Sequence, residues 1–386
     1  MIDAVYFGGS AVELDTIAYD VGIIVGRRDT TTTYAPSSCR ITFYDVVADS
    51  YTALVGKTLV IAGNAYCLFA GYITDVRLTV ATATSGARCD IIAAGPSSRL
   101  GLIQAGGSGY AAHTLEDRLD AIATESTSQG GFDFSDQTGT DEGAYTLSAY
   151  TAGAATATSL FQEFLEPYGG CLYDLPDDGG GIFVPTTTGK IAYYTADLAP
   201  DDLYAQNLSA TFTLFAPVFD QSGQIINDVV ITYDTGTVTR SNAESQLLYG
   251  KRTRSITTTI DNATNANDLG DEIISRARRP RWNISEVVYE QSTIGPEILY
   301  WRIGNEITIN DLPTGSPTTT YVGIVQGWEH KISQQKFRTT FYVADPAELG
   351  YGIPWEKIPQ TASYQWDSIN QTVIWDNALT LADLTA

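Results

Sequence analysis

The sequence is poor in the residues from which catalytic and metal sites are most often built. It has two histidines, four cysteines and a single methionine among 386 residues. No G-x-S-x-G nucleophile motif accompanies His113 or His330, and no His or Cys residues have zinc-ligand spacing. With 45 acidic residues, carboxylate pairs arise by chance and do not identify a glycosidase. These absences predict a protein that is not an enzyme and holds no cofactor or metal.

Basic residues are also scarce. The 22 lysines and arginines stand against 45 acidic residues, which gives a formal net charge of −23. Such a surface repels phosphate groups and anionic membranes, so stable nucleic-acid binding is disfavoured. No continuous apolar run approaches the length of a membrane-spanning helix, and the start of the chain lacks the features of a signal peptide. We therefore expect no membrane insertion.

The cysteines form no C-x-x-C pair. Three of them, Cys39, Cys89 and Cys171, lie in or next to strand-like runs, and Cys67 lies in another. Buried free thiols are predicted rather than disulfides or metal ligands, which fits synthesis in a reducing compartment.

What the sequence has in abundance is Thr, Tyr, Gly, Val and Ile, which favours β structure. One β pattern occurs twice. Gly56 and Gly304 each precede a strand of alternating apolar residues, and a second strand follows that begins aromatic-x-Gly, at Gly71 and Gly323. We expect these glycines to lie where the backbone bends or approaches another strand closely, and the chain to contain a duplicated β unit.

The chain is predicted to be mainly β with a small α+β insert. We divide it into a barrel-like β domain (1–105), an α+β insert (106–205), a second barrel-like domain with one helix (206–345) and an aromatic tail (346–386). Capping residues predict helices beginning at Thr114, Ser159 and Asn267, and a loop is expected over 126–143.

Two groups of residues are candidates for contacts with other chains. Aromatic residues in the tail could anchor a partner or complete the chain's own core; they are Tyr351, Trp355, Trp366 and Trp375. Clustered basic residues could pair with an acidic neighbouring subunit; they are Arg27, Arg28, Lys251, Arg252 and Arg254. Intrachain ion pairs and contact with nucleic acid are the alternatives for the basic group.

Several segments resemble one family, the minor tail proteins of long-tailed bacteriophages. The segments are 23–28, 41–45, 68–75, 275–282, 304–313 and 323–330. The aromatic end with its two Trp-Asp pairs is similar to the ends of such proteins in phages of actinobacteria. These proteins are tail-tip hubs, similar to the baseplate hubs of contractile tails.

The resemblance implies a particular assembly. Two barrel-like domains per chain would surround the insert, and a homotrimer would form a six-part ring at the end of the tail tube. The expected partners are tail-tip, tail-tube and tape-measure proteins, with DNA only as passing cargo. Such a subunit would be made in the bacterial cytoplasm and end in the virion. The alternative is a glycan-binding or glycan-cleaving β protein, for which exposed aromatics and acidic loops would serve.

Overall fold

The computed structural model describes residues 2–344 with internal gaps. The gaps are 13, 15–17, 29–33, 45–52, 64–65, 81–86, 132, 137–144, 154, 169, 177–188, 195–205, 209–218, 221–224, 281–282, 292–301, 311, 313–314, 317–319 and 335. The aromatic candidates Tyr351, Trp355, Trp366 and Trp375 lie outside the described residues, so their role stays a prediction.

The first β unit contains both strands with one covered face and strands that are buried on both faces, such as β5 (Thr58–Gly63). Its strands are β1 (Ile2–Phe7), β2 (Ser10–Val12), β3 (Tyr19–Gly26), β4 (Ala35–Tyr44), β5 (Thr58–Gly63), β6 (Tyr66–Thr79) and β7 (Arg88–Ala94). Along β3, Val21, Ile23 and Val25 are at most 3% exposed, whereas the residues between them are not buried. This is the period-two pattern of a strand with one covered face.

The second β unit follows later in the chain. Its strands are β20 (Asn283–Ile284), β21 (Glu286–Gln291), β22 (Glu306–Ile309), β23 (Tyr321–Ser333) and β24 (Phe337–Ala344), together with the earlier short strands β15 (Gln206–Leu208) and β16 (Phe219–Asp220). The predicted mainly β class is confirmed, and closure of either unit into a barrel stays a prediction.

The two units repeat the same hydrogen-bonding pattern. Gly56 and Gly304 both have a positive φ, 85° and 92°. Their N–H groups donate to the carbonyls of Ile73 and Val325, each at 2.8 Å. Leu59, three residues after Gly56, pairs with Gly71, and Ile307, three residues after Gly304, pairs with Gly323.

The strands that follow also correspond. The ladder between β6 and β7 has a bulge after Ile73, and the ladder between β23 and β24 has one after Val325. The strand triplets β5–β6–β7 and β22–β23–β24 are therefore equivalent, as the repeated glycine pattern predicts.

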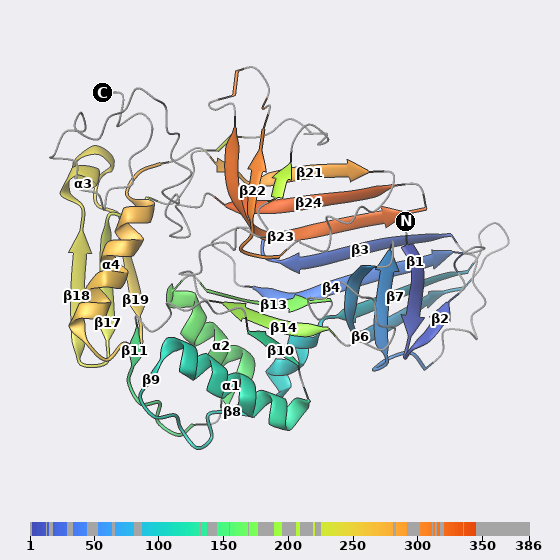
Figure 1. Cartoon of the computed structure of the whole chain (residues 1–386), viewed down its shortest axis with the longest axis horizontal. Helices are drawn as coiled ribbons and strands as arrows, with labels where there is room; N and C mark the ends of the chain where they lie inside the picture. Colours follow the sequence, from blue (N-terminus) through green and yellow to red (C-terminus); the bar gives the residue numbers. More distant parts are fainter. Residues whose placement is uncertain are drawn as a thin grey trace.

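One sheet joins the two units. Strand β23 pairs with β3 in antiparallel register from Gly327–Gly26 to Ser333–Asp20. The hydrogen-bonded order is β15-β22-β23-β3-β4-β7-β6-β5-β1-β2, with β24 and then β21 beside β23. Figure 1 shows the strands of both units side by side in this sheet.

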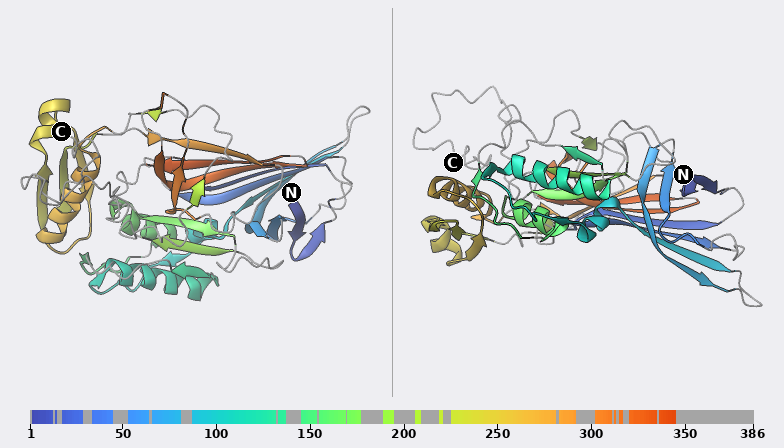
Figure 2. Two further views of the ribbon diagram at one scale, coloured as in Figure 1. Left: turned by 45° about the horizontal axis from the view of Figure 1, so that its top comes forward. Right: turned by 90° about the horizontal axis from the view of Figure 1, so that it is seen from below.

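The α+β insert covers one face of the sheet (Figure 2). The short elements η2 (Pro96–Leu102) and β8 (Gln104–Ala105) lead into it. It contains β9 (His113–Thr114), α1 (Leu115–Gly130), β10 (Phe134–Asp136), β11 (Thr146–Leu147), β12 (Ala155–Thr156), α2 (Ala157–Leu165), η4 (Glu166–Tyr168), β13 (Cys171–Leu175) and β14 (Lys190–Tyr194). Cys171, Tyr173 and Leu175 of β13 pack in the same apolar cluster as Val21 and Ile41.

The helix boundaries correct two predictions in the insert. Thr114 caps α1 as expected, but the helix continues through the predicted loop start to Gly130, and it includes the buried Ser126, whose hydroxyl donates to the carbonyl of Ile122. Helix α2 is capped by Thr156 and not by Ser159. The Thr156 hydroxyl accepts a hydrogen bond from the N–H of Ser159.

A further unit of three strands and two helices packs beside the insert. It comprises β17 (Asp228–Tyr233), β18 (Gly236–Ser241), α3 (Ala243–Tyr249), β19 (Thr253–Thr257) and α4 (Ala263–Ala277). Asn262, not Asn267, caps α4 by accepting the N–H of Asn265. Val229, Ile231 and Leu269 share an apolar cluster with Leu119 and Phe161 of the insert. The four-part division of the chain stays a prediction, and this cluster joins segments on both sides of residue 205.

Asp174 ties the insert to the first β unit. Its carboxylate accepts the N–H groups of Ser37 and Ser97, each at 2.7 Å, and the Ser97 hydroxyl at 3.0 Å. Complete burial raises the pKa of Asp174, and these hydrogen bonds oppose the rise. The insert is thus fixed to the sheet by a buried polar contact as well as by apolar packing.

All four cysteines are buried free thiols, which confirms the prediction. Within the part of the chain that the structure describes, no helix has the length and apolar character needed to cross a membrane.

Candidate functional site

The junction between the two β units is the first candidate assembly feature. Gly26 of β3 has φ +79°, and a Cβ atom there would lie 2.4 Å from the carbonyl oxygen of Gln326. A Cβ on Gly327 would lie 2.5 Å from the carbonyl oxygen of Val25. Only glycine allows the strands to approach so closely.

A partly buried polar contact closes this junction. Arg27 donates from Nε and Nη2 to the Gln326 side-chain oxygen at 3.0 and 2.7 Å, and Tyr34 donates to the same oxygen at 3.2 Å. The Arg27 guanidinium also lies 4.4 Å from the centroid of the Tyr34 ring. Arg27, predicted as an inter-subunit residue, therefore makes its described contacts within the chain, across the two units.

The other basic candidates lie on exposed surface. Arg28 lies over the ring of Tyr342 at 5.7 Å, and Lys251 pairs with the buried Asp228 at 3.1 Å. Arg252 and Arg254 are exposed near the start of β19. A role between subunits stays a prediction for these four residues.

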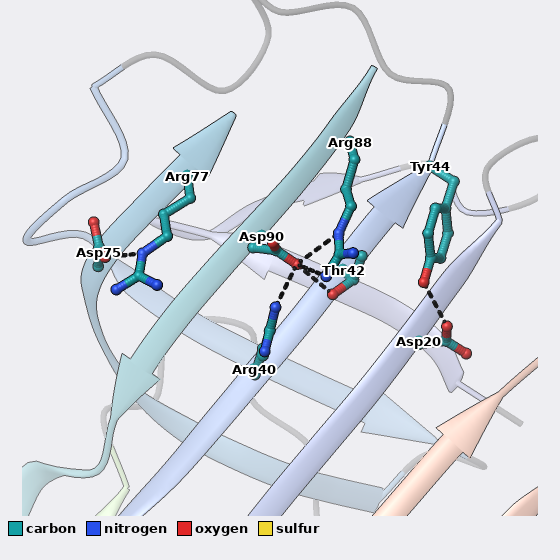
Figure 3. A network of polar contacts seen from close by, with 8 residues as sticks. All are labelled: Asp20, Arg40, Thr42, Tyr44, Asp75, Arg77, Arg88 and Asp90. Atoms are coloured by element: carbon teal, nitrogen blue, oxygen red, sulfur yellow. Dashed lines mark hydrogen bonds and ion pairs between the residues drawn. The ribbon is translucent and has the colours of Figure 1, made fainter. Parts of the chain in front are cut away.

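The second candidate feature is a polar sheet face, the side of β3, β4, β7 and β6 that points away from the insert. Figure 3 shows its side chains, which are Asp20, Arg40, Thr42, Tyr44, Asp75, Arg77, Arg88 and Asp90. Period-two alternation places them on one side, since the residues between them face the apolar cluster. Because β23 pairs with β3, the polar sheet face continues onto Glu329 and Lys331, which lie 3.1 Å apart.

Asp90 is the centre of this network. It accepts hydrogen bonds from Thr42 at 2.6 Å and from Arg88 at 2.9 Å, and Arg40 lies 3.2 Å away. Burial opposes ionisation of the carboxyl, but the three donors outweigh it and hold the pKa of Asp90 below its usual value. Charges of both signs are thus paired within the face.

Replacing Asp90 with asparagine tests this network. We expect the free energy of unfolding at neutral pH to fall by about 1–2 kcal/mol, because two charge-assisted hydrogen bonds are lost. A lowered pKa contributes stability above the unfolded value of 3.8 that is lost as the pH falls through the native value, so the two proteins should converge in strong acid. Urea unfolding across this range measures the difference.

The matched control is Asp75→Asn. Asp75 pairs with Arg77 at 2.8 Å on the same face, but their side chains are 45% and 69% exposed. Exposed pairs contribute little, so a change below about 0.5 kcal/mol is expected. Equal losses for the two variants would contradict the central role of Asp90.

The third candidate feature is the open edge of β6 from Asp75 to Thr79. Strand β7 pairs with this segment on one side, and in the described part of the chain no strand pairs with the other side. Leu78 pairs with Cys89 of the apolar cluster, yet it is 39% exposed, and Val80, directly after the strand, is 75% exposed. Open edges with apolar side chains are sites for pairing with another strand.

Neither histidine belongs to a catalytic arrangement in the described structure. His330 is 2% exposed, with Nδ1 2.8 Å from the Thr339 hydroxyl, and His113 lies on the short strand β9 of the insert. No group of three or more His, Cys, Asp or Glu residues among those described could hold a metal ion.

Sequence comparisons identify no relative, since no family model and no curated protein matches this chain. Solved structures do match. A tail protein from Neisseria meningitidis MC58 is similar with a TM-score of 0.62 and 11% identity, covering 90% of this chain and 98% of that one. The 43 kDa tail protein of prophage MuSo2 from Shewanella oneidensis gives 0.61 and 13%, covering 90% and 100%.

A third structure, the E. coli c3393 protein, gives a TM-score of 0.50 at 10% identity, covering 85% of this chain and 73% of that one. It is described as a component of the type VI secretion system with structural similarity to the T4 bacteriophage tail proteins gp27 and gp5. The chain therefore has the fold of phage tail proteins, along the full length of two of them.

Proposed function

We propose that this chain is a structural subunit of a phage tail tip. It forms a homotrimeric hub ring at the end of the tail tube, docks neighbouring tip, tube and tape-measure proteins, and has no catalytic role. The observation that carries this proposal is the duplicated β unit joined edge to edge in one sheet, in a chain with the fold of tail proteins. Two equivalent units per chain let three copies meet a sixfold tube.

The polar sheet face supplies the wall of the channel in this proposal. The face carries equal numbers of acidic and basic side chains: Asp20, Asp75, Asp90 and Glu329 against Arg40, Arg77, Arg88 and Lys331. A face without excess positive charge has little net attraction for a phosphate backbone. Such a wall lets DNA pass without binding it, which agrees with a chain of net charge −23.

Removing residues 346–386 tests the docking role predicted for the aromatic tail. We expect the shortened chain to fold and stay soluble but to be missing from purified phage tails, because its Trp and Tyr anchors are gone. Particles made with full-length or shortened chain are compared by mass spectrometry and by immunogold labelling of the tail end. Label along the tail or on the capsid would refute the tip position, and loss of folding would assign the tail to the chain's own core. A monomer that binds cell-wall glycan would favour the alternative function.

A further inference from the structure

Helix α3 presents two strongly exposed apolar side chains. Leu247 and Leu248 are 86% and 62% exposed, and Leu247 is the most exposed large apolar side chain among the described residues. The other side of the helix is anchored, because the buried Ser245 donates its hydroxyl to the carbonyl of Arg278 at the end of α4 at 2.5 Å. The two leucines are therefore held on the surface by a fixed helix.

Basic side chains lie next to these leucines, although the chain as a whole is strongly acidic. Lys251 and Arg279 each pair with a carboxylate, at 3.1 and 3.3 Å. Arg252 and Arg254 are exposed and form no ion pair with a described residue. We call Leu247, Leu248, Arg252 and Arg254 the α3 surface. In a chain of net charge −23, it fits a ligand that is both apolar and acidic.

The strand that carries Arg254 also has an unpaired edge. Strand β19 pairs with β17 in the order β18-β17-β19, so its outer edge has no neighbour among the described strands. An exposed strand edge can hold an extended segment through backbone hydrogen bonds. The α3 surface and this edge together offer apolar, cationic and backbone contacts.

One segment of the chain itself has the complementary chemistry. Residues 346–386 hold five acidic residues and one basic residue, together with three tryptophans and two tyrosines. Trp366 and Trp375 are each followed directly by an aspartate. In such a pair the carboxylate can bond an arginine while the ring packs against a leucine.

The segment also starts on the side of the molecule where α3 lies. Strand β24 runs antiparallel to β21 and β23, and it ends at Ala344 at the end of the sheet that faces α4 (Figure 1). An extended chain advances about 3.3 Å per residue, so the segment can span on the order of 100 Å. It can therefore reach the α3 surface of its own chain.

We infer that residues 346–386 dock on the α3 surface of the same chain. The tryptophan rings pack against the two leucines, and the aspartates that follow them pair with Arg252 and Arg254. Docking buries large apolar side chains on both sides, which keeps the free chain soluble. The contact needs no second copy, so it goes beyond the proposed ring: it covers the anchors predicted to bind neighbouring tail proteins until those proteins are present.

The first test is protection of the full-length chain from chymotrypsin. The protease must take the ring of Trp366 or Trp375 into its own pocket, so it cuts only the undocked segment. Leu247→Gln with Leu248→Gln removes the apolar contact but keeps residues that favour a helix. We expect cutting after these tryptophans to be at least about 10-fold faster in the double variant, because two buried leucines are lost. Mass spectrometry of the released fragments measures the rates.

The matched control is Val55→Gln with Leu102→Gln, because these side chains are 62% and 80% exposed elsewhere on the chain. This variant should be cut at the wild-type rate. Arg252→Gln with Arg254→Gln tests the charged contact, and it should be cut faster than the wild type at about 50 mM salt but not at about 1 M, where charges are screened. A wild-type chain that is cut as fast as the leucine variant would overturn the inference.

The second test is cross-linking, which separates the chain's own segment from that of a neighbour. Ala243 is exposed on α3, and Ser368 follows the first Trp-Asp pair. The double variant Ala243→Cys with Ser368→Cys is treated with a short bis-maleimide at about 1 µM chain, where a link within one chain outcompetes a link between chains. The four native cysteines are buried and do not react. We expect the two new cysteines to be linked within the monomer.

Cross-linked dimers that form on mixing the two single-cysteine variants would place the segment on a neighbouring copy and overturn the inference. The outcomes also differ from those of the proposed function. A ring that forms while the segment is cut freely leaves the hub proposal standing and refutes docking on α3. A chain that stays monomeric at its highest soluble concentration refutes the ring, whereas a protected segment and a link within the monomer would still support the inference.

Discussion

Replacing Gly26 with alanine is expected to destabilise the protein by about 2–5 kcal/mol. A left-handed backbone costs a non-glycine residue about 1–2 kcal/mol, and forcing a methyl group into a filled space costs about 1–3 kcal/mol more. At Gly26 both apply, because φ is +79° and the new Cβ would lie 2.4 Å from a backbone oxygen of β23. This clash can be relieved only if β3 and β23 move apart, so the variant would lose the junction between the two units.

Gly22→Ala is the control on the same strand. A Cβ there meets nothing within 4 Å. Alanine restricts the unfolded chain more than glycine does, so a neutral or slightly stabilising effect is expected. Urea unfolding of both variants gives the comparison, and equal stabilities would show that the junction tolerates a wider strand spacing than its geometry indicates.

The sequence revealed the duplication because its signal is local. Gly56 and Gly304 precede equivalent strands, and the third residue after each of them, Leu59 or Ile307, pairs with Gly71 or Gly323. Alternation also indicated strands, but its implication of one exposed face is wrong for β5, where Leu59, Val60 and Ile61 are all buried. These features depend on residues that are close in the sequence, so they can be recognised without knowledge of the rest of the fold.

The junction between the units could not be predicted in the same way. Gly26 and Gly327 lie inside or at the end of strands, with no turn motif, and their need for glycine arises only when the two strands meet. The error at α4 has a different, local cause. Asn262 and Asn267 both precede apolar positions, and the choice of cap is made by the N–H of Asn265 in the folded chain.

The candidate contact residues show a similar limit. Composition identified Arg27 as unusual in an acidic chain, but its partner Gln326 is distant in sequence and uncharged. The open edge of β6 is recognisable only by comparing the exposure of Leu78 with that of its counterpart His330, which lies at the same distance after the bulge in β23. Sequence patterns predict the strands, but the assembled sheet determines which strand edges remain unpaired.

The buried imidazole of His330 is expected to make the free energy of unfolding depend strongly on pH. His330 is buried beside Phe337, with ring centroids 5.3 Å apart, and burial lowers its pKa from 6.5 to about 3. In the unfolded chain His330 takes up a proton below about pH 6.5, whereas the native protein takes it up only near pH 3. Unfolding is therefore favoured as the pH falls between these values, by about 1.4 kcal/mol per pH unit.

Substituting His330 with leucine, the residue at the equivalent position of the first unit, should remove this dependence. We expect the free energy of unfolding of the wild type to fall more steeply than that of His330→Leu between pH 6.5 and pH 4, and the two to differ in slope by about one proton. Thr339→Val is the control, because it removes the hydroxyl 2.8 Å from Nδ1 but leaves the imidazole buried, so the steep slope should persist. Parallel curves for wild type and His330→Leu would mean that the imidazole can be protonated within the folded sheet. In that case the second unit would be open to water beside β3, and the burial of His330 could no longer serve as the standard against which the exposed edge of β6 is judged.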